Sequence, residues 1–338
     1  DNITATVSLT RGTGCAPIDY GYEGNLGLTV ERLAGPGRVQ TAVEVSQRAF
    51  PNGADTVLLA DAGNFPDALA AAPLAADLDA PVLLTPAAEL AAEVATELER
   101  LGATDVVLLG GEAALSAAVE NALSDYEVTR LAGSGRVETS VEVAEALAGE
   151  DGEVPGAILV RADAFPDALA ASNLAIPNGL PILLTGSSGL DAAAEAALDD
   201  LVADGAVVYL AGGTAALTEQ VATDVAAAGF VPKRLSGASR YATAAAITQE
   251  ALTTTGASFG SAMLASGTNF PDALTAGPAA AQLGGMLVLV DPGSLDASPE
   301  SRSLLSANAG SIRRLFIAGG TAAVSQAVQD QAVAVLGG

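Results

Sequence analysis

Three short stretches of this chain share one pattern. They read RLAGPGR at Arg32–Arg38, RLAGSGR at Arg130–Arg136 and RLSGASR at Arg234–Arg240, and their first arginines lie 98 and then 104 residues apart. A period of about 100 residues is the size of a whole domain and is too long for an ordinary solenoid repeat. We therefore expect the 338 residues to contain three copies of one domain-sized unit.

Two further motifs recur in the same order within each copy. Phe-Pro-Asp-Ala-Leu stands at Phe65–Leu69, Phe165–Leu169 and Phe270–Leu274, and a Gly-Gly pair stands at residues 110–111, 212–213 and 319–320. Because order and spacing hold three times, chance does not explain them. We place the repeat modules at residues 28–125, 126–229 and 230–338, preceded by an N-terminal arm or strand at residues 1–27.

Each copy alternates strands with helices. In the first copy, continuous apolar runs such as Val57–Leu59 and Val106–Leu109 predict strands that are buried on both faces, which is typical of a parallel sheet. Helices are expected over residues 39–50, from 65 to about 76, over 87–101 and over 115–123. The predicted fold class is α/β, with three repeated modules that each hold a mainly parallel sheet flanked by helices.

The two ends of the repeated region indicate how the copies join. Every copy opens with a strand, at residues 28–33 in the first, whereas the chain ends on a helix near residues 326–336. If each opening strand completes the sheet of the preceding copy, the strand at 28–33 can complete the sheet of the last one. We therefore predict a closed ring of modules with pseudo-threefold symmetry.

Composition argues against several classes of function. The 40 acidic residues outnumber the 14 basic ones, and the formal net charge of −26 disfavours binding to nucleic acid or to an anionic membrane surface. The sequence has no histidine, which excludes His-based triads and His–metal sites. Cys15 alone can form neither an internal disulfide nor a zinc cage, so it is either a buried thiol or a link between chains. No apolar run approaches the ~18 residues of a membrane span, and we expect no metal or cofactor.

The recurring aspartates allow two interpretations. Asp67, Asp167 and Asp272 fall in the first turn of a helix that begins with proline, where a carboxylate favours the exposed amides without any ligand. The same loop also lies at the carboxyl end of a predicted strand, where α/β folds place binding sites. There an aspartate could accept hydrogen bonds from sugar hydroxyls or hold a cation.

The recurring arginines also need a partner. Arg38, Arg136 and Arg240 stand at helix starts, which is unfavourable for the helix dipole, and are followed three residues later by Thr41, Thr139 and Thr243. The partner is either a recurring aspartate in a neighbouring module or an anionic ligand, which a guanidinium can bind in bidentate fashion. The earlier set (Arg32, Arg130 and Arg234) is expected to anchor the sheet edge. The Gly-Gly pairs lack the G-x-G-x-x-G and P-loop patterns, so we expect no nucleotide.

Residues 1–27 lie outside the repeats. Thr4–Thr10 alternates like a strand and is either a surface strand or disordered arm of the molecule or a strand donated to a neighbouring molecule. Asn2 begins a glycosylation sequon. The chain starts at Asp1 instead of Met, which is expected of a sequence whose leader was removed or trimmed.

Together these motifs resemble the cell-wall-binding repeat 2 family. The family's RLSG-x-x-R-Y-x-T opening is nearest to type at Arg234–Thr243, and its GG-x-x-A-hydrophobic-S closing segment recurs at residues 110–116, 212–218 and 319–325. The resemblance covers about residues 26–336. It implies an exported, extracellular protein at the cell surface or cell wall, whose modules pack as a pseudo-trimer and attach non-covalently to an anionic cell-wall polymer. Tyr241 is replaced by Val39 and Val137 in the other copies, so the copies need not bind equally.

We therefore expect a non-catalytic protein that is anchored to a cell-wall polysaccharide or teichoic-acid-like polymer. The candidate contacts are the recurring residues Arg38, Arg136, Arg240, Asp67, Asp167, Asp272, Thr41, Thr139 and Thr243. Since the net charge repels polyanions at long range, binding requires local arginines, bound cations or high salt. The alternative is a self-assembling surface-layer or filament subunit that uses residues 1–27 for subunit contacts. An enzyme comes third, because no paired acid–base or metal-ligand pattern is present.

Overall fold

The computed structural model describes residues 27–64, 66–149, 152–163, 166–257 and 259–337, together with the backbone of residues 5–9 and 18–22. The glycosylation candidate Asn2 and the thiol of Cys15 lie outside these residues, so both stay predictions.

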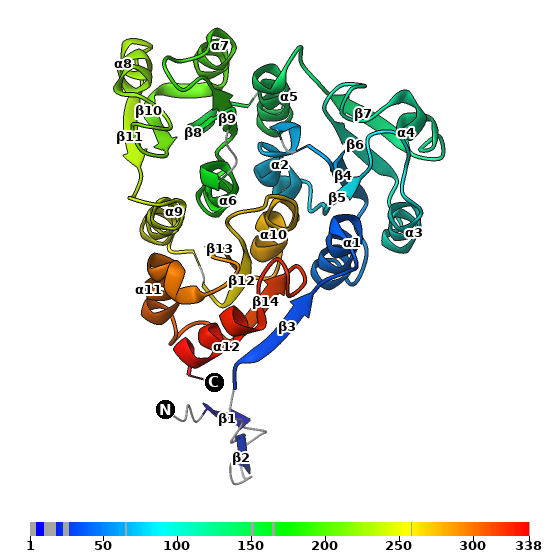
Figure 1. Ribbon diagram of the computed structural model, residues 1–338, viewed down its shortest axis with the longest axis vertical. Coiled ribbons are helices and arrows are strands. Elements are labelled where there is room, and N and C mark those ends of the chain that lie inside the picture. Colours follow the sequence, from blue (N-terminus) through cyan, green and yellow to red (C-terminus); the bar gives the residue numbers. More distant parts are fainter. Residues whose placement is uncertain are drawn as a thin grey trace.

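Three sheets of four parallel strands form the frame of the molecule, one in each lobe of Figure 1. The first has the order β5-β4-β6-β7 and contains β4 (Thr56–Asp61), β5 (Val82–Thr85), β6 (Asp105–Leu109) and β7 (Glu127–Leu131). The second has the order β9-β8-β10-β11 and contains β8 (Val154–Arg161), β9 (Ile182–Thr185), β10 (Val202–Ala211) and β11 (Val231–Leu235). The third has the order β13-β12-β14-β3 and contains β12 (Ser261–Ser266), β13 (Gly285–Val290), β14 (Arg314–Ala318) and β3 (Thr29–Leu33).

The predicted closure of the ring is confirmed. β3 pairs in parallel with β14, with Thr29 opposite Arg314 and Leu33 opposite Ala318. In the same way β7 completes the first sheet and β11 the second, although each of these strands opens the next sequence repeat. Every sheet therefore contains one strand from the following repeat, and the three modules close on one another with pseudo-threefold symmetry (Figure 1).

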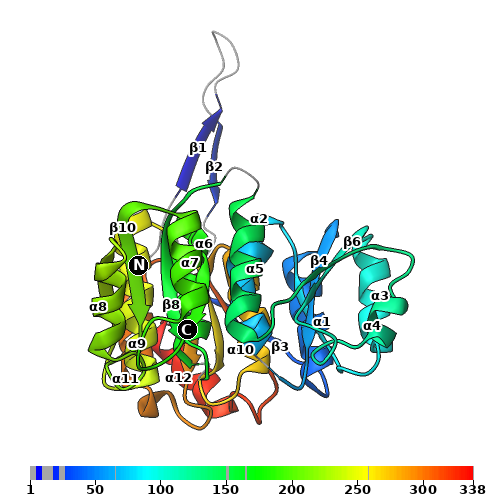
Figure 2. The same ribbon diagram turned by 90° about the horizontal axis from the view of Figure 1, so that it is seen from above.

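Helices cover the sheets on both sides, as the continuous apolar strands predict. The opening helix of each module is α1 (Arg38–Ala49), α5 (Arg136–Ala148) or α9 (Arg240–Thr255). The second helix is α2 (Ala71–Asp77), preceded by the short 3₁₀ turn η1 (Pro66–Ala68), then α6 (Pro166–Asn178) and α10 (Pro271–Gln282). The remaining helices are α3 (Ala92–Leu101), α4 (Ala117–Asn121), α7 (Ala192–Leu201), α8 (Glu219–Ala227), η2 (Leu295–Ala297), α11 (Pro299–Ala307) and α12 (Gln326–Val335). In Figures 1 and 2, α3 and α4 lie on the outer side of the first sheet and α2 on its inner side.

The helices α2, α6 and α10, here called the central helices, contact one another around the pseudo-threefold axis (Figure 1). Each also packs against the opening helix of the next module: α2 against α5, α6 against α9, and α10 against α1. Their buried faces are built from alanine and leucine, and one continuous hydrophobic cluster includes Leu74, Leu174 and Leu274 from all three modules. The scarcity of aromatic residues therefore reflects close helix packing, which small side chains allow.

The arginines that end the opening strands anchor the sheet edge, as predicted. Arg32 Nη1 donates to the carbonyl oxygens of Gly319 and Val324 at 2.8 and 2.9 Å, and its Nη2 donates to Oε1 of Gln329 at 2.9 Å. Arg130 and Arg234 donate in the same way to the carbonyls of Gly110 and Gly212, at 2.7 and 3.0 Å. Each guanidinium thus fastens the Gly-Gly loop of one module to the opening strand of the next.

Three local expectations differ from the structure. The helix expected from residue 87 begins only at Ala92, because Thr85 Oγ1 accepts the N–H of Ala91 and donates to the carbonyl of Glu89, which holds residues 86–91 in a loop. The helix expected from 65 to 76 is divided into η1 and α2. The strand expected at 4–10 is present as β1 (Ala5–Leu9), but it pairs antiparallel with a second strand, β2 (Ile18–Tyr22), that the turn-rich sequence did not predict.

Among the helices of the described ranges, none combines the length and the apolar character needed to span a bilayer.

Substituting Arg32→Ala tests how far ring closure depends on these contacts. The change removes three hydrogen bonds between β3 and the end of the third module, and we expect a loss of about 1–3 kcal/mol in the free energy of unfolding. Urea denaturation followed by circular dichroism measures this loss. The matched control is Arg302→Ala, which removes an exposed arginine and is expected to change stability by less than about 0.5 kcal/mol. Equal stability of the two variants would contradict the role assigned to Arg32.

Candidate functional site

The recurring arginines lie at the edge of each sheet where the parallel strands end. Each stands at the start of an opening helix and is exposed to solvent. Its Nη1 donates to a main-chain carbonyl just beyond β4, β8 or β12, the second strand of its own module: Arg38 to Ala62 at 2.6 Å, Arg136 to Ala162 at 3.0 Å, and Arg240 to Gly267 at 2.6 Å. The guanidinium is held in place by one nitrogen while the group stays open to solvent.

The recurring threonines organise the loop that precedes each arginine. In every module the hydroxyl oxygen accepts a main-chain N–H at 3.2 Å: Thr41 from Gly35, Thr139 from Gly133, and Thr243 from Gly237. All three side chains are buried, at 2–3% exposure. The threonines therefore fix the position of the arginine, and the arginine is the exposed member of the pair.

The recurring aspartates lie half-buried at the start of the central helices, against the Gly-Gly loops. A Cβ added to Gly110 would lie 2.6 Å from Oδ2 of Asp67, and one added to Gly212 would lie 2.7 Å from Oδ2 of Asp167. Asp272 meets Gly319 in the same way, and the three glycines have φ values of +93°, +117° and +101°. Glycine is therefore required both by the positive φ and by the closeness of the carboxylate.

The aspartate of one module shares its surroundings with the arginine of the next. We call each pair a junction, and the three junctions are Asp67 with Arg136, Asp167 with Arg240, and Asp272 with Arg38. Burial raises the pKa of each aspartate, to about 6 for Asp167, and the positive charge of the paired arginine acts in the opposite direction. Among the residues that the structure describes, no junction arginine has a guanidinium nitrogen within 4 Å of a carboxylate oxygen of its paired aspartate. The expected bridge between neighbouring modules therefore takes the form of an electrostatic attraction without direct contact.

The three junctions differ in their charged neighbours. In the first, the carboxylate of Asp61 adds a negative charge beside Asp67. In the second, Arg161 adds a positive charge beside Asp167 and forms an ion pair with Asp163. In the third, the guanidinium of Arg38 lies over the ring of Phe270, 5.7 Å from its centroid. The motifs did not reveal these neighbours. The last residue of the buried strand differs between the copies, as Asp61, Arg161 or Ser266, and this difference is a signal in the sequence.

Tyr241, the residue that departs from valine in the third module, has a steric partner. Its ring lies over Gly267, where an added Cβ would be 2.5 Å from Cε1 of the tyrosine. The equivalent residues after β4 and β8 in the other modules are Ala62 and Ala162, and there the smaller Val39 and Val137 replace the tyrosine. A larger side chain at the position of Tyr241 thus goes together with a smaller residue at the position whose carbonyl accepts the hydrogen bond from the arginine.

The junctions combine exposed hydrogen-bond donors with half-buried acceptors on an open surface. None of the three described cavities is lined by a junction arginine or aspartate. In the described part of the chain, no group of three acidic or cysteine side chains could hold a metal ion. Such a surface can bind anionic groups through guanidinium and hydroxyl groups through carboxylate.

Comparison with known proteins is consistent with this architecture. The family model of cell wall binding domain 2 (CWB2) matches residues 32–120, 130–222 and 234–329. The N-acetylmuramoyl-L-alanine amidase LytC of Bacillus subtilis (strain 168) is 29% identical over 305 residues, which cover 90% of this chain and 58% of that protein. The amidase enhancer of the same organism is 34% identical over 167 residues, which cover 49% of this chain and 23% of that protein. The chain thus spans less than two thirds of these relatives.

Two solved structures have the same fold. Cwp8 from Clostridium difficile has a TM-score of 0.79 at 28% identity, over 91% of this chain and 52% of that one. Cwp6 from the same organism has a TM-score of 0.79 at 23% identity, over 97% of this chain and 51% of that one.

The raised pKa of Asp167 predicts a pH-dependent effect of Asp167→Asn. Because the folded-state pKa of about 6 exceeds the ordinary aspartate pKa of 3.8, the wild type gains stability as pH falls through 6, whereas the amide does not titrate. The stability of the variant relative to wild type should therefore fall by about 1 kcal/mol between pH 7.5 and pH 5. Urea denaturation at both pH values measures it.

Asp163→Asn is the matched control for this experiment. Arg161 lowers the pKa of Asp163, so its carboxylate is ionised in both the folded and unfolded states above pH 5. Its stability relative to wild type should not change over the same interval. If the stability of Asp167→Asn relative to wild type were also the same at both pH values, the raised pKa of Asp167 would be contradicted.

Proposed function

Since this chain belongs to the cell wall binding domain 2 family, we propose that it is a non-catalytic cell-surface protein that attaches non-covalently to an anionic cell-wall polymer. The polymer-binding units are the three repeat modules at residues 28–125, 126–229 and 230–338. The contacts are the exposed guanidinium groups of the junctions, with the aspartates accepting hydrogen bonds from polymer hydroxyls and the buried threonines holding the arginine loops.

One observation carries this proposal: the exposed arginines recur at equivalent places in all three modules. Each of Arg38, Arg136 and Arg240 is fixed by a hydrogen bond to a main-chain carbonyl, so little side-chain entropy is lost when an anion binds. A repeating polymer can contact several junctions of one rigid ring, and binding at the first raises the effective concentration at the others.

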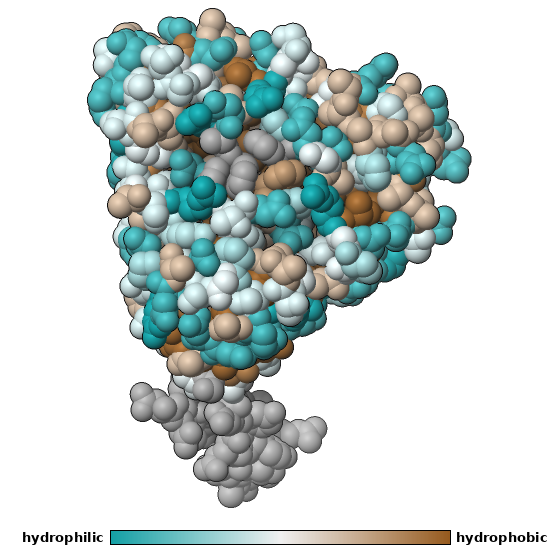
Figure 3. All heavy atoms as spheres, in the orientation of Figure 1, coloured by the Kyte–Doolittle hydropathy of each residue, from teal (hydrophilic) through white to brown (hydrophobic). Residues whose placement is uncertain are grey.

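The overall charge is compatible with an anionic partner only through such local groups. At −26 the chain repels a polyanion at long range, and salt screens this repulsion over about 10 Å at 0.1 M. Contact between a guanidinium and an anionic group is shorter and is screened less. On the face shown in Figure 3, hydrophilic and hydrophobic residues are mixed over all three lobes, which suits contact with a hydrated polymer.

A binding role also agrees better with the junctions than catalysis does. Each junction pairs one aspartate with one arginine, and Asp61 adds a second carboxylate beside Asp67 in the first, whereas glycoside hydrolysis uses two carboxyl groups on either side of the bond. The amidase activity in the name of the Bacillus relative belongs to that protein, of which this chain spans 58%.

Co-sedimentation with purified cell walls tests the proposal. We expect each of Arg38→Ala, Arg136→Ala and Arg240→Ala to weaken retention several-fold and the triple variant to weaken it at least about tenfold, because each removes one charge-assisted contact. Arg302→Ala, which changes the net charge equally on an exposed helix, should bind like the wild type. Circular dichroism checks that every variant is folded. Unchanged retention of the triple variant would remove the arginines from the site.

Deletion of residues 1–27 separates anchoring from self-assembly. The strand β1 pairs with β2 and, within the described part of the chain, with no strand of the three sheets. We expect the deletion to leave wall retention unchanged, since the junctions lie entirely in the repeats. Light scattering then measures whether the full chain and the shortened chain polymerise. If the full chain polymerises and the shortened chain does not, the surface-layer or filament alternative is favoured instead.

A further inference from the structure

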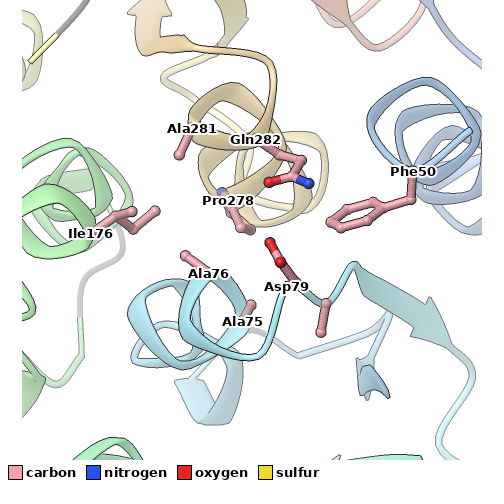
Figure 4. Close-up of a pocket in the computed structure, with 9 residues that line it drawn as sticks. Phe50, Ala75, Ala76, Asp79, Ile176, Pro278, Ala281 and Gln282 are labelled. Atoms are coloured by element: carbon pink, nitrogen blue, oxygen red, sulfur yellow. The ribbon is translucent and has the colours of Figure 1, made fainter. Parts of the chain in front are cut away.

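A cavity of about 150 Å³ lies on the pseudo-threefold axis at the end opposite to the junctions. The junction aspartates stand at the starts of the central helices, whereas this cavity is lined by residues from the last turns of those helices. We call it the axial cavity, and its lining residues include Phe50, Ala76, Asp79, Ile176, Pro278 and Gln282 (Figure 4). A cavity of this volume can hold a molecule the size of benzene.

At the open side of the axial cavity lies the carboxylate of Asp79, an exposed residue that the threefold repeat does not require. In Figure 4 the carboxylate of Asp79 points inward toward Gln282, and the ring of Phe50 lies beside them. Asp79 has a φ of +51°, and the residues at the same distance from the Phe-Pro-Asp-Ala-Leu motif in the other modules are Gly179 and Gly284, with φ of +62° and +67°. Glycine adopts this conformation more readily than aspartate. The first module therefore has an acidic side chain at a position where the backbone conformation favours glycine.

The electrostatics of the axial cavity favour a cation. Because α2, α6 and α10 all end at this side, the negative ends of their helix dipoles lie next to the carboxylate. No lysine or arginine is among the described residues that line it, and no ion pair of the described chain involves Asp79. The net charge of −26 also raises the local concentration of cations.

The remaining lining indicates what kind of cation fits. Ca²⁺ takes six to eight oxygen ligands and Mg²⁺ six, and a single carboxylate in an apolar cavity does not supply them. An adjoining cavity of about 200 Å³ shares Ile176 and Ala281 with the axial cavity and is lined further by apolar groups, among them Pro177 and Met286. Beside Asp79, the axial cavity itself presents the ring of Phe50, a surface that attracts ammonium groups.

We propose that the axial cavity binds a small organic ammonium ion. The ammonium nitrogen donates hydrogen bonds to the carboxylate of Asp79 and to the amide oxygen of Gln282. The hydrocarbon part contacts Phe50 and Ile176 and extends toward the adjoining cavity. This ligand site is independent of the wall-binding site, because the two lie at opposite ends of the central helices.

Isothermal titration of the full chain with n-butylammonium chloride tests the proposal, with 1-butanol and sodium chloride titrated at the same ionic strength. Wild type should bind butylammonium saturably, and more tightly than either comparison solute. Asp79→Asn and Asp79→Gly should each weaken binding at least about tenfold, because both remove the charged acceptor. The glycine variant restores the residue type of the other modules, so folding is retained.

Asp77→Asn is the matched control. It removes the same charge two residues away, at an exposed position that does not line the cavity, and should leave butylammonium affinity unchanged. Equal loss in Asp77→Asn, equal affinity for butanol or sodium, or no saturable binding by wild type would overturn the proposal. Wall retention of Asp79→Gly should equal that of wild type, so failure here is distinguishable from failure of the wall-binding function.

Discussion

The pairing of β3 with β14 is the interaction on which the rest of the structure depends. Without it the third sheet lacks its edge strand, and no sheet pairing joins the first repeat to the last. The same exchange of an opening strand between neighbours brings each opening helix against the central helix of the preceding module. The arginine at the start of each opening helix therefore lies near the aspartate at the start of the central helix of the preceding module. The junctions are a consequence of ring closure, since no single repeat contains both partners of a junction.

Much of this arrangement could be predicted from the sequence because the same motifs occur three times in the same order. Repetition located the modules, and the missing last strand indicated the ring. Features that occur once were harder to predict. The late start of α3 depends on two hydrogen bonds of Thr85, and β2 lies in a segment outside the repeats. For the site, the motifs identified the recurring residues, but the packing decides that the threonines are buried, and that the arginines donate to carbonyls and face aspartates of the preceding module.

The differences between copies are as informative as the repetition. A repeated fold preserves the residues that make the ring, such as the arginines that fasten each Gly-Gly loop. It leaves the last positions of the buried strands free to vary, and these set the charge of each junction through Asp61, Arg161 or Ser266. Variation also occurs in pairs, since Tyr241 is accommodated only where Gly267 replaces alanine. A ring of similar modules can thus present three chemically distinct surfaces to one polymer.

The strand that closes the ring has a consequence for how the molecule is made. Thr29 and Arg314 are partners although they lie 285 positions apart in the sequence, so β3 is synthesised long before its partner strand β14. During that time its main-chain groups have no ladder partner, which is a hazard for aggregation. The strand is only five residues long, and Thr29 and Glu31 keep its exposed face polar. A short strand with a polar face is less prone to pair with other chains, which protects β3 until the last module has been synthesised.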